Sequence, residues 1–154
     1  MKLLGQIVAT IIVLMTGITF ASGSYAAESG KPHRIAIQVD QSDPALMNLV
    51  LNNVSNVLEH YHGKNEDVQI EVVAYGPGLN MLREDKSPVK ERIKRIAEGS
   101  FPSKVSFSAC GNTMQVMEKA EGQPVPIITQ ASVVPAGVVR LSELQEQGWS
   151  YIRP

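Results

Sequence analysis

Hydrophobic and polar residues alternate along this chain with two different periods. Short stretches repeat every second position, as at Ile35, Ile37 and Val39, and this period predicts β-strands. Longer stretches repeat every three or four positions, most regularly from Leu46 to Tyr61, and this period predicts amphipathic helices. Strands that alternate with helices predict a parallel sheet covered by helices, because each crossover must return the chain to the same end of the sheet.

The same pattern places the boundaries of the elements. We expect strands at 33–40, 67–75, 105–109, 133–134 and 149–152, and helices at 44–62, 88–99, 114–122 and 138–148. Asp43 before a proline predicts the start of the first helix, and Gly63 suits a left-handed residue at its end. The fold class predicted is α/β, a three-layer α/β/α sandwich with a mainly parallel sheet of about five strands. Residues 33–154 form its single domain.

The first residues have a different composition. Lys2 precedes an apolar run from 3 to 21, and Ser24 and Ala26 supply the small residues of a cleavage site. We therefore interpret residues 1–26 as a secretory signal peptide, which predicts a periplasmic protein, and 27–32 as a flexible leader. An uncleaved N-terminal anchor is the alternative, and a membrane contact is expected only in that case.

The net charge and the absence of known motifs argue against nucleic-acid, nucleotide and metal binding. The formal net charge is −1 and no basic run is present, so we expect no nucleic-acid partner. No dinucleotide or phosphate-loop motif occurs, and His33, His60 and His62 lack the spacing of a metal site. We therefore expect no cofactor and no metal.

The single cysteine is the main candidate for chemistry. Cys110 follows the alternating strand at 105–109 and precedes Gly111, Asn112 and Thr113, which we interpret as a turn and a helix cap. A thiol at a helix N-terminus has a lowered pKa, because unpaired N–H groups and the helix dipole stabilise the thiolate. The alternative is a buried cysteine that only fills space. The sequence does not decide between a reactive thiol and a packing residue.

Other candidates are expected beside this cysteine. The loops after Val39, Tyr75, Ala109 and Val134 should meet at one edge, where ligands bind to parallel sheets. Gly76 and Gly78 could admit a ligand to the backbone, or simply form a turn. Asn112 and Thr113 could donate hydrogen bonds to a bound group, or simply cap the helix.

Three further predictions concern polar residues. Asp40 could point into the same edge, although a turn or capping role beside Ser42 is favoured. His60 and His62 are interpreted as a solvated helix end, and Glu118 and Glu121 as a solvent-facing helix surface.

Three segments together resemble the DsrE/DsrF-like family. They are residues 74–78 (AYGPG), 105–114 (VSFSACGNTM) and 134–154, which contain the ending VPAGVVRLSELQEQGWSYIRP. The resemblance implies a parallel-sheet α/β sandwich that assembles into homotrimers or hexamers. In sulfur-relay members it also implies a cysteine that carries sulfur as a persulfide between partner proteins, a role that maps onto Cys110.

Two hypotheses follow. In the first, the chain is a sulfur carrier or a sulfurtransferase-like protein. Its Cys110 thiolate exchanges sulfur with a donor or acceptor protein, while Gly111, Asn112 and Thr113 stabilise the anion. In the second, it is a non-enzymatic periplasmic module that binds a small ligand or assembles with a partner near Gly76 and Gly78, and Cys110 is structural.

Overall fold

The computed structural model describes residues 32–154. The predicted signal peptide, 1–26, lies outside the described residues, as does the predicted leader except its last residue. The strands are β1 (His33–Val39), β2 (Val68–Ala74), β3 (Lys104–Cys110), β4 (Ala131–Val134) and β5 (Ser150–Ile152). The helices are α1 (Pro44–His62), α2 (Lys90–Gly99), α3 (Gly111–Glu121) and α4 (Gly137–Glu146), with a 3₁₀ helix, η1 (Gly76–Leu82), after β2.

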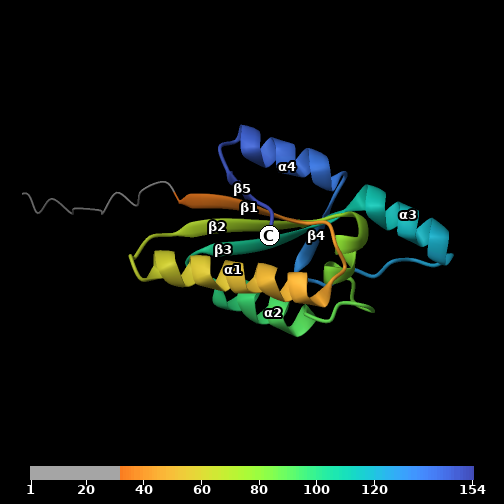
Figure 1. Cartoon of the computed structure of the whole chain (residues 1–154), viewed down its shortest axis with the longest axis horizontal. Helices are drawn as coiled ribbons and strands as arrows, with labels where there is room; N and C mark the ends of the chain where they lie inside the picture. The colour runs from red at the N-terminus through yellow and green to blue at the C-terminus, as the bar shows by residue number, and fades with distance from the viewer. Residues whose placement is uncertain (1–31) are drawn as a thin grey trace, which may run out of the picture.

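The five strands form one parallel sheet in the order β4-β3-β2-β1-β5. Figure 1 shows α1 and α2 on one face, α4 on the other, and α3 extending beyond the end of the sheet. The predicted α/β sandwich with a parallel sheet of five strands is therefore confirmed. None of the helices in residues 32–154 combines the length and apolar character needed to cross a bilayer.

The face under α1 and α2 holds the main hydrophobic core. The odd-numbered positions of β1 and β3 point to this face, as the alternation predicts, and Ile37 and Phe107 are almost fully buried there. Burial of this apolar surface is the principal source of stability, at about 25 cal/mol per Å². Val50, Leu51 and Val54 contribute the matching face of α1.

The opposite face, under α4, is smaller and more polar. Its buried apolar cluster consists of Ala36, Val73, Leu141 and Leu144. Beside this cluster Glu71 accepts paired hydrogen bonds from Arg140 of α4 at 2.7 Å each, and another from the Ser108 hydroxyl. A buried carboxylate is tolerated only when it is paired in this way.

The chain crosses the sheet in one direction from β1 to β4 and then returns over the opposite face to β5 at the other edge. Met114 and Met117 place α3 against the α1/α2 core, whereas α4 packs on the other face. The connections that leave the adjacent ends of β3 and β4 thus diverge to opposite sides of the sheet. In open parallel sheets such a point forms a crevice where ligands bind.

Three local predictions were wrong. Gly63 has φ −62° and is not left-handed; α1 continues into a turn, and Asn65 takes the positive φ of 56° instead. The segment from Gly76 to Leu82 is a 3₁₀ helix and not an open loop. The predicted turn at 111–113 is absent, because β3 leads directly into α3.

Candidate functional site

Cys110 lies at the junction of β3 and α3 and belongs to both. It pairs with Val134 of β4 as the last residue of its strand, and it is also the N-cap of α3, with φ −70° and ψ 113°. Gly111, Asn112 and Thr113 therefore form the first turn of the helix, where backbone N–H groups have no intrahelical partner. The cysteine side chain takes the position that serine or aspartate usually occupies at a helix start.

A second helix also begins at this cysteine. Gly137 is the first residue of α4, and a Cβ atom added to it would lie 3.3 Å from the Cys110 Cβ and 2.9 Å from the Tyr75 Cβ. The absence of a side chain at Gly137 thus allows the N-terminus of α4 to approach the thiol. Gly137 was not among the site residues predicted from the sequence, although it directly precedes an apolar helical pattern.

The thiol is buried and its pKa is lowered. Cys110 is only 5% exposed. Burial opposes the charged form, but the Thr113 hydroxyl and the backbone N–H groups of Gly137, Thr113 and Asn112 together outweigh it, so the pKa of Cys110 falls below its ordinary value. Both helices contribute to this effect, which favours a thiolate.

Thr113 and Gly76 are in direct contact. The Gly76 N–H donates to the Thr113 Oγ1 at 2.9 Å, which joins the start of η1 to the first turn of α3. Gly76 has a φ of +51°, a conformation in which glycine is strongly preferred. The structure therefore brings two of the predicted site residues together beside Cys110.

The remaining predicted site residues, Gly111, Asn112 and Gly78, contact the backbone of neighbouring strands and loops. A Cβ at Gly111 would lie 3.1 Å from the Val134 carbonyl oxygen, and the Asn112 N–H donates to the Pro135 carbonyl at 3.1 Å. Gly78 lies against the backbone of β1, where a Cβ would overlap the Val39 carbonyl. These three residues fix α3, β4 and η1 in place around the site.

A polar cluster occupies the next part of the same edge. Asp40 accepts hydrogen bonds from Gln38 at 3.0 Å and from Arg153 at 2.8 Å, so the favoured turn or capping role with Ser42 was wrong. Burial, Asp40 and Tyr151 raise the pKa of Tyr75, which keeps its phenol protonated. This cluster joins β1 to the end of the chain after β5.

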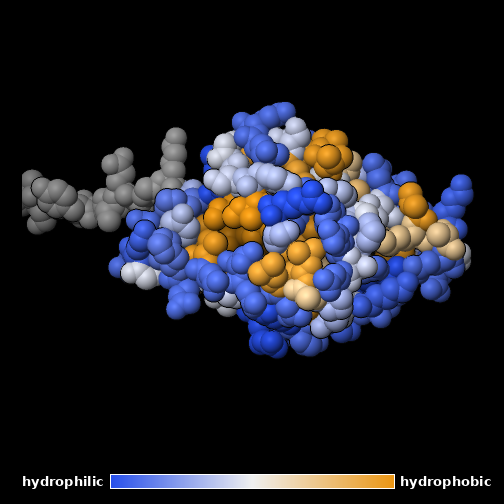
Figure 2. Space-filling model, viewed as in Figure 1, coloured by the Kyte–Doolittle hydropathy of each residue, from blue (hydrophilic) through white to orange (hydrophobic). Residues whose placement is uncertain are grey.

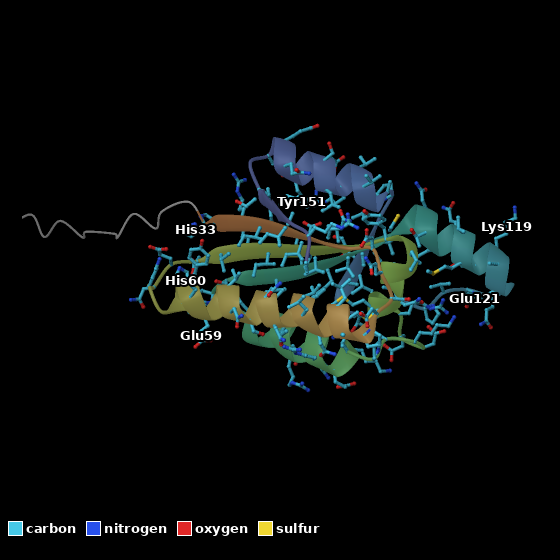
Figure 3. All side chains as sticks on the ribbon, in the orientation of Figure 1. His33, Glu59, His60, Lys119, Glu121 and Tyr151 are labelled. Carbon is cyan, nitrogen blue, oxygen red and sulfur yellow. The ribbon has the colours of Figure 1, made fainter. Side chains whose placement is uncertain are left out.

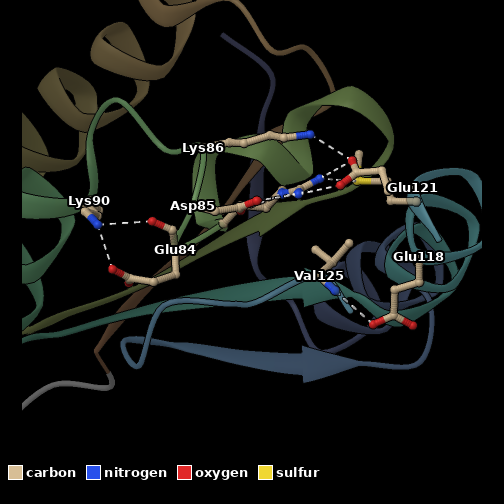
Figure 4. A network of polar contacts seen from close by, with 9 residues as sticks. Glu84, Asp85, Lys86, Lys90, Glu118, Glu121 and Val125 are labelled. Carbon is tan, nitrogen blue, oxygen red and sulfur yellow. Dashed lines mark hydrogen bonds and ion pairs between the residues drawn. The ribbon is translucent and has the colours of Figure 1, made fainter. Parts of the chain in front are cut away.

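The far end of α3 is fixed by an ion-pair network (Figure 4). Arg83 is fully buried and donates to both Glu121 oxygens, at 2.6 and 2.8 Å, and to Asp85. Hydrogen bonds from Arg83 and Lys86 lower the pKa of Glu121 to about 2. Glu118 and Glu121 lie on α3, which has no buried residue, as predicted, and Glu118 also accepts a hydrogen bond from the Val125 N–H.

A cavity lies on the Cys110 side of the sheet. It has a volume of about 360 Å³ and a mostly apolar lining. Its walls are Val134, Pro135, Ala136, Val139, Arg140 and Glu143. Val134 pairs with Cys110 across β3 and β4, but Cys110 is not among the residues that line the cavity.

The histidines lie at the opposite end of the sheet. Figure 3 shows His33 and His60 there, far from Lys119 and Glu121 on α3. His33 stacks on Tyr61 and contacts Glu66, and His62 shares a hydrogen bond with Ser103. In residues 32–154, no three His, Cys, Asp or Glu side chains come close enough together to hold a metal ion.

The fold and site can be compared with known proteins. A solved structure of the protein of unknown function MTH1491 from Methanobacterium thermoautotrophicum has a TM-score of 0.66 and 32% sequence identity, with the match covering 79% of this chain and 99% of that one. No curated protein matches the chain. The profile of the DsrE/DsrF-like family matches residues 18–154, which include every residue of the site described above. The chain therefore belongs to the DsrE/DsrF-like family.

Proposed function

We propose that this protein carries sulfur as a persulfide on Cys110. The observation that supports the proposal is the position of one thiol at the N-termini of two helices, α3 and α4, with a lowered pKa. The thiolate is the nucleophile of sulfur exchange, so a site that stabilises it suits this reaction. The resemblance to sulfur-relay members of the DsrE/DsrF-like family implies a persulfide-carrying cysteine, and we assign that role to Cys110.

The reaction consists of two sulfur exchanges. In loading, the Cys110 thiolate attacks the outer sulfur of a donor persulfide, the donor S–S bond breaks, and the donor leaves as a thiolate while Cys110 becomes a persulfide. In discharge, an acceptor thiolate attacks the outer sulfur of Cys110 and releases the Cys110 thiolate. One S–S bond forms and one breaks in each step, so neither step needs an external oxidant or reductant.

Intact-mass spectrometry tests this function. The native protein is treated with a polysulfide, and an adduct of about 32 Da per sulfur is expected on wild type and absent from Cys110→Ser. Discharge onto an added thiol should remove the adduct. Wild-type protein that stays unmodified while a small reference thiol in the same tube is modified would rule out the carrier function.

A second function is favoured by the burial of the thiol. Because Cys110 is only 5% exposed, it can also be a packing residue in a non-enzymatic module that binds a small ligand or a partner loop. Titration of the native protein with a chromogenic disulfide separates the two functions. Reaction below neutral pH supports the carrier, and reaction only after denaturation supports the module.

We also propose that the protein is a homo-oligomer, a trimer or hexamer. The proposal is supported by exposed valines, Val116 on α3, Val133 on β4, and Val138 and Val139 on α4. Figure 2 shows hydrophobic surface over the end of α4 that is nearest to α3. Light scattering should give a trimer or hexamer for wild type and a smaller species for Val138→Asp. Leu49→Asp, at an exposed apolar position of α1, is the matched control; a monomeric wild type would contradict the proposal.

Export is proposed from the sequence of residues 1–26. The basic start, apolar run and small residues before Ala27 support cleavage after Ala26 and a periplasmic location. N-terminal sequencing of protein from a periplasmic extract should begin at Ala27. A chain that keeps Met1 in the membrane fraction would support the uncleaved anchor instead.

A further inference from the structure

We propose that the basic end of the sheet face under α4 is a binding site for a small oxyanion such as sulfate or phosphate. The site is a polar hollow between α4 and the starts of β2 and β3, with Lys104 and Arg140 in its wall and Arg34 beside it. It is a second site, and it does not depend on the proposed sulfur-carrier function.

Three polar side chains form a row across the sheet at this end. Arg34 of β1 is in register with Gln69 of β2, which is in register with Lys104 of β3. Ala36 and Val73 belong to the cluster under α4 and lie an even number of residues further along the first two strands, so Arg34 and Gln69 point to the same face. Side chains in register on adjacent parallel strands share a face, so Lys104 points there too. The row therefore carries two positive charges and no carboxylate.

The charges of Arg34 and Lys104 are not neutralised by the protein. Neither side chain forms an ion pair with a carboxylate of residues 32–154. A Cβ atom added to Gly148 would lie 3.5 Å from the Arg34 Nη2, which places this guanidinium directly before Trp149, a residue of the wall of the hollow. Two uncompensated cations thus border one small polar space.

The one carboxylate that lines the hollow is already in use. Glu71 accepts hydrogen bonds from Arg140 Nε and Nη2 and from the Ser108 hydroxyl, at 2.7 Å each. The Arg140–Glu71 pair is therefore neutral and does not cancel the charges of the row. The pair also fixes the Arg140 guanidinium, whose Nη1 keeps only a 3.7 Å contact with the exposed Glu143 and can donate to a bound anion.

The size of the hollow selects the class of ligand. Its volume is about 140 Å³, and its lining is mostly polar. Pockets for organic ligands usually have about 300–1,000 Å³, whereas one water molecule occupies about 30 Å³. The hollow therefore suits a single small ion with a few waters. Guanidinium, ammonium and amide N–H donors match the oxygens of sulfate and phosphate.

The oxyanion site is separate from the thiol. Lys104 and Cys110 are the first and last residues of β3. At a rise of about 3.3 Å per residue, their Cα atoms are about 20 Å apart. An anion held by Lys104 therefore cannot contact the sulfur, and its binding should be the same in Cys110→Ser.

Isothermal titration calorimetry with sodium sulfate or sodium phosphate in a low-salt buffer tests the site. Wild type should bind one anion per chain. Lys104→Gln and Arg34→Gln should each weaken binding by about tenfold or more, because each removes a charged hydrogen-bond donor. Lys119→Gln removes the same charge from an exposed position of α3, so it is the matched control and should keep the wild-type affinity.

The second readout is thermal unfolding. Millimolar sulfate should raise the Tm of wild type and Cys110→Ser alike, because a ligand that binds only the folded state stabilises it. Sodium chloride of equal ionic strength should have a smaller effect, and Lys104→Gln should lose the difference between the two salts. A wild type that binds neither anion would overturn the inference. Lys104→Gln and Arg34→Gln proteins that are folded by circular dichroism and bind with wild-type affinity would also overturn it.

Discussion

The two faces of the sheet differ in what they bury. Under α1 and α2 the described residues form a continuous apolar core that includes Phe107. Under α4 the buried apolar cluster is small, and the same strands present Glu71, Ser108 and Cys110. The first face stabilises the fold, whereas the second keeps polar and nucleophilic groups in a buried setting. Alternate residues of β3 contribute to the two faces: Phe107 points into the apolar core, whereas Ser108 and Cys110 point to the face under α4.

The difference between the two faces determines where this fold can place a charged nucleophile. An apolar face cannot hold an ionised group without a large cost, so a thiolate must lie where hydrogen-bond donors are available. At the end of β3 such donors come from the starts of α3 and α4, which diverge to opposite sides of the sheet. Cys110 is thus on the polar face and at the edge where the two helices begin.

Adjacent residues of β3 offer the sharpest contrast between the faces. Phe107→Ala removes a nearly fully buried ring from the α1/α2 core and should lower the free energy of unfolding by about 3–5 kcal/mol. Ser108→Ala removes one hydrogen bond to Glu71 and should cost about 1 kcal/mol. Urea denaturation measures both, and equal losses would show that the two faces do not differ as described.

The ion pair of the polar face should control the response to acid. Burial opposes ionisation of Glu71, but hydrogen bonds from Arg140 and Ser108 prevail and hold its pKa below the usual 4.5. A lowered folded-state pKa stabilises the fold above the unfolded pKa, and this contribution is lost as pH falls through the folded value. Glu71→Gln should therefore cost about 1–3 kcal/mol near neutral pH and show a shallower loss of stability below about pH 4.5. Parallel pH profiles for the two proteins would contradict this account.

The close approach of α4 to Cys110 can be tested at Gly137. A Cβ there would lie 2.9 Å from the Tyr75 Cβ, so Gly137→Ala should destabilise the protein by about 1–3 kcal/mol and raise the pKa of Cys110 as its N–H moves away. Gly99→Ala is the matched control, because nothing lies within 4 Å of its added Cβ. It should leave the thiol pKa unchanged. A Gly137→Ala protein in which the pKa of Cys110 is unchanged would show that α4 does not stabilise the thiolate.

Much of the fold was predictable because hydrophobic periodicity reports which side of a strand is buried. The alternation at 105–109 identified the two faces of β3, and the Asp43–Pro44 pair identified the start of α1. The meeting of four loops at one edge followed from parallel strands alone. Cys110 was selected for the same reason, since the pattern of the strand ends where the helical pattern begins.

The details of the site depend on contacts that are distant in sequence. Gly137 reaches Cys110 only because α4 crosses to the other face, and no local pattern encodes this crossing. Thr113 was selected as a cap, yet its partner is Gly76, far away along the chain. Arg83 was missed because a charged residue after an apolar segment usually indicates solvent, whereas Glu121 and Asp85 allow it to be buried.

The fold, and not the cysteine alone, stabilises the Cys110 thiolate. The most direct test is the pH dependence of alkylation of Cys110 in the native protein and in the same protein unfolded in urea. The native thiol should ionise at a lower pH than the unfolded one, because the helix starts and Thr113 stabilise its charge. A native pKa equal to or above the unfolded value would contradict it, since burial would then outweigh every donor around the sulfur.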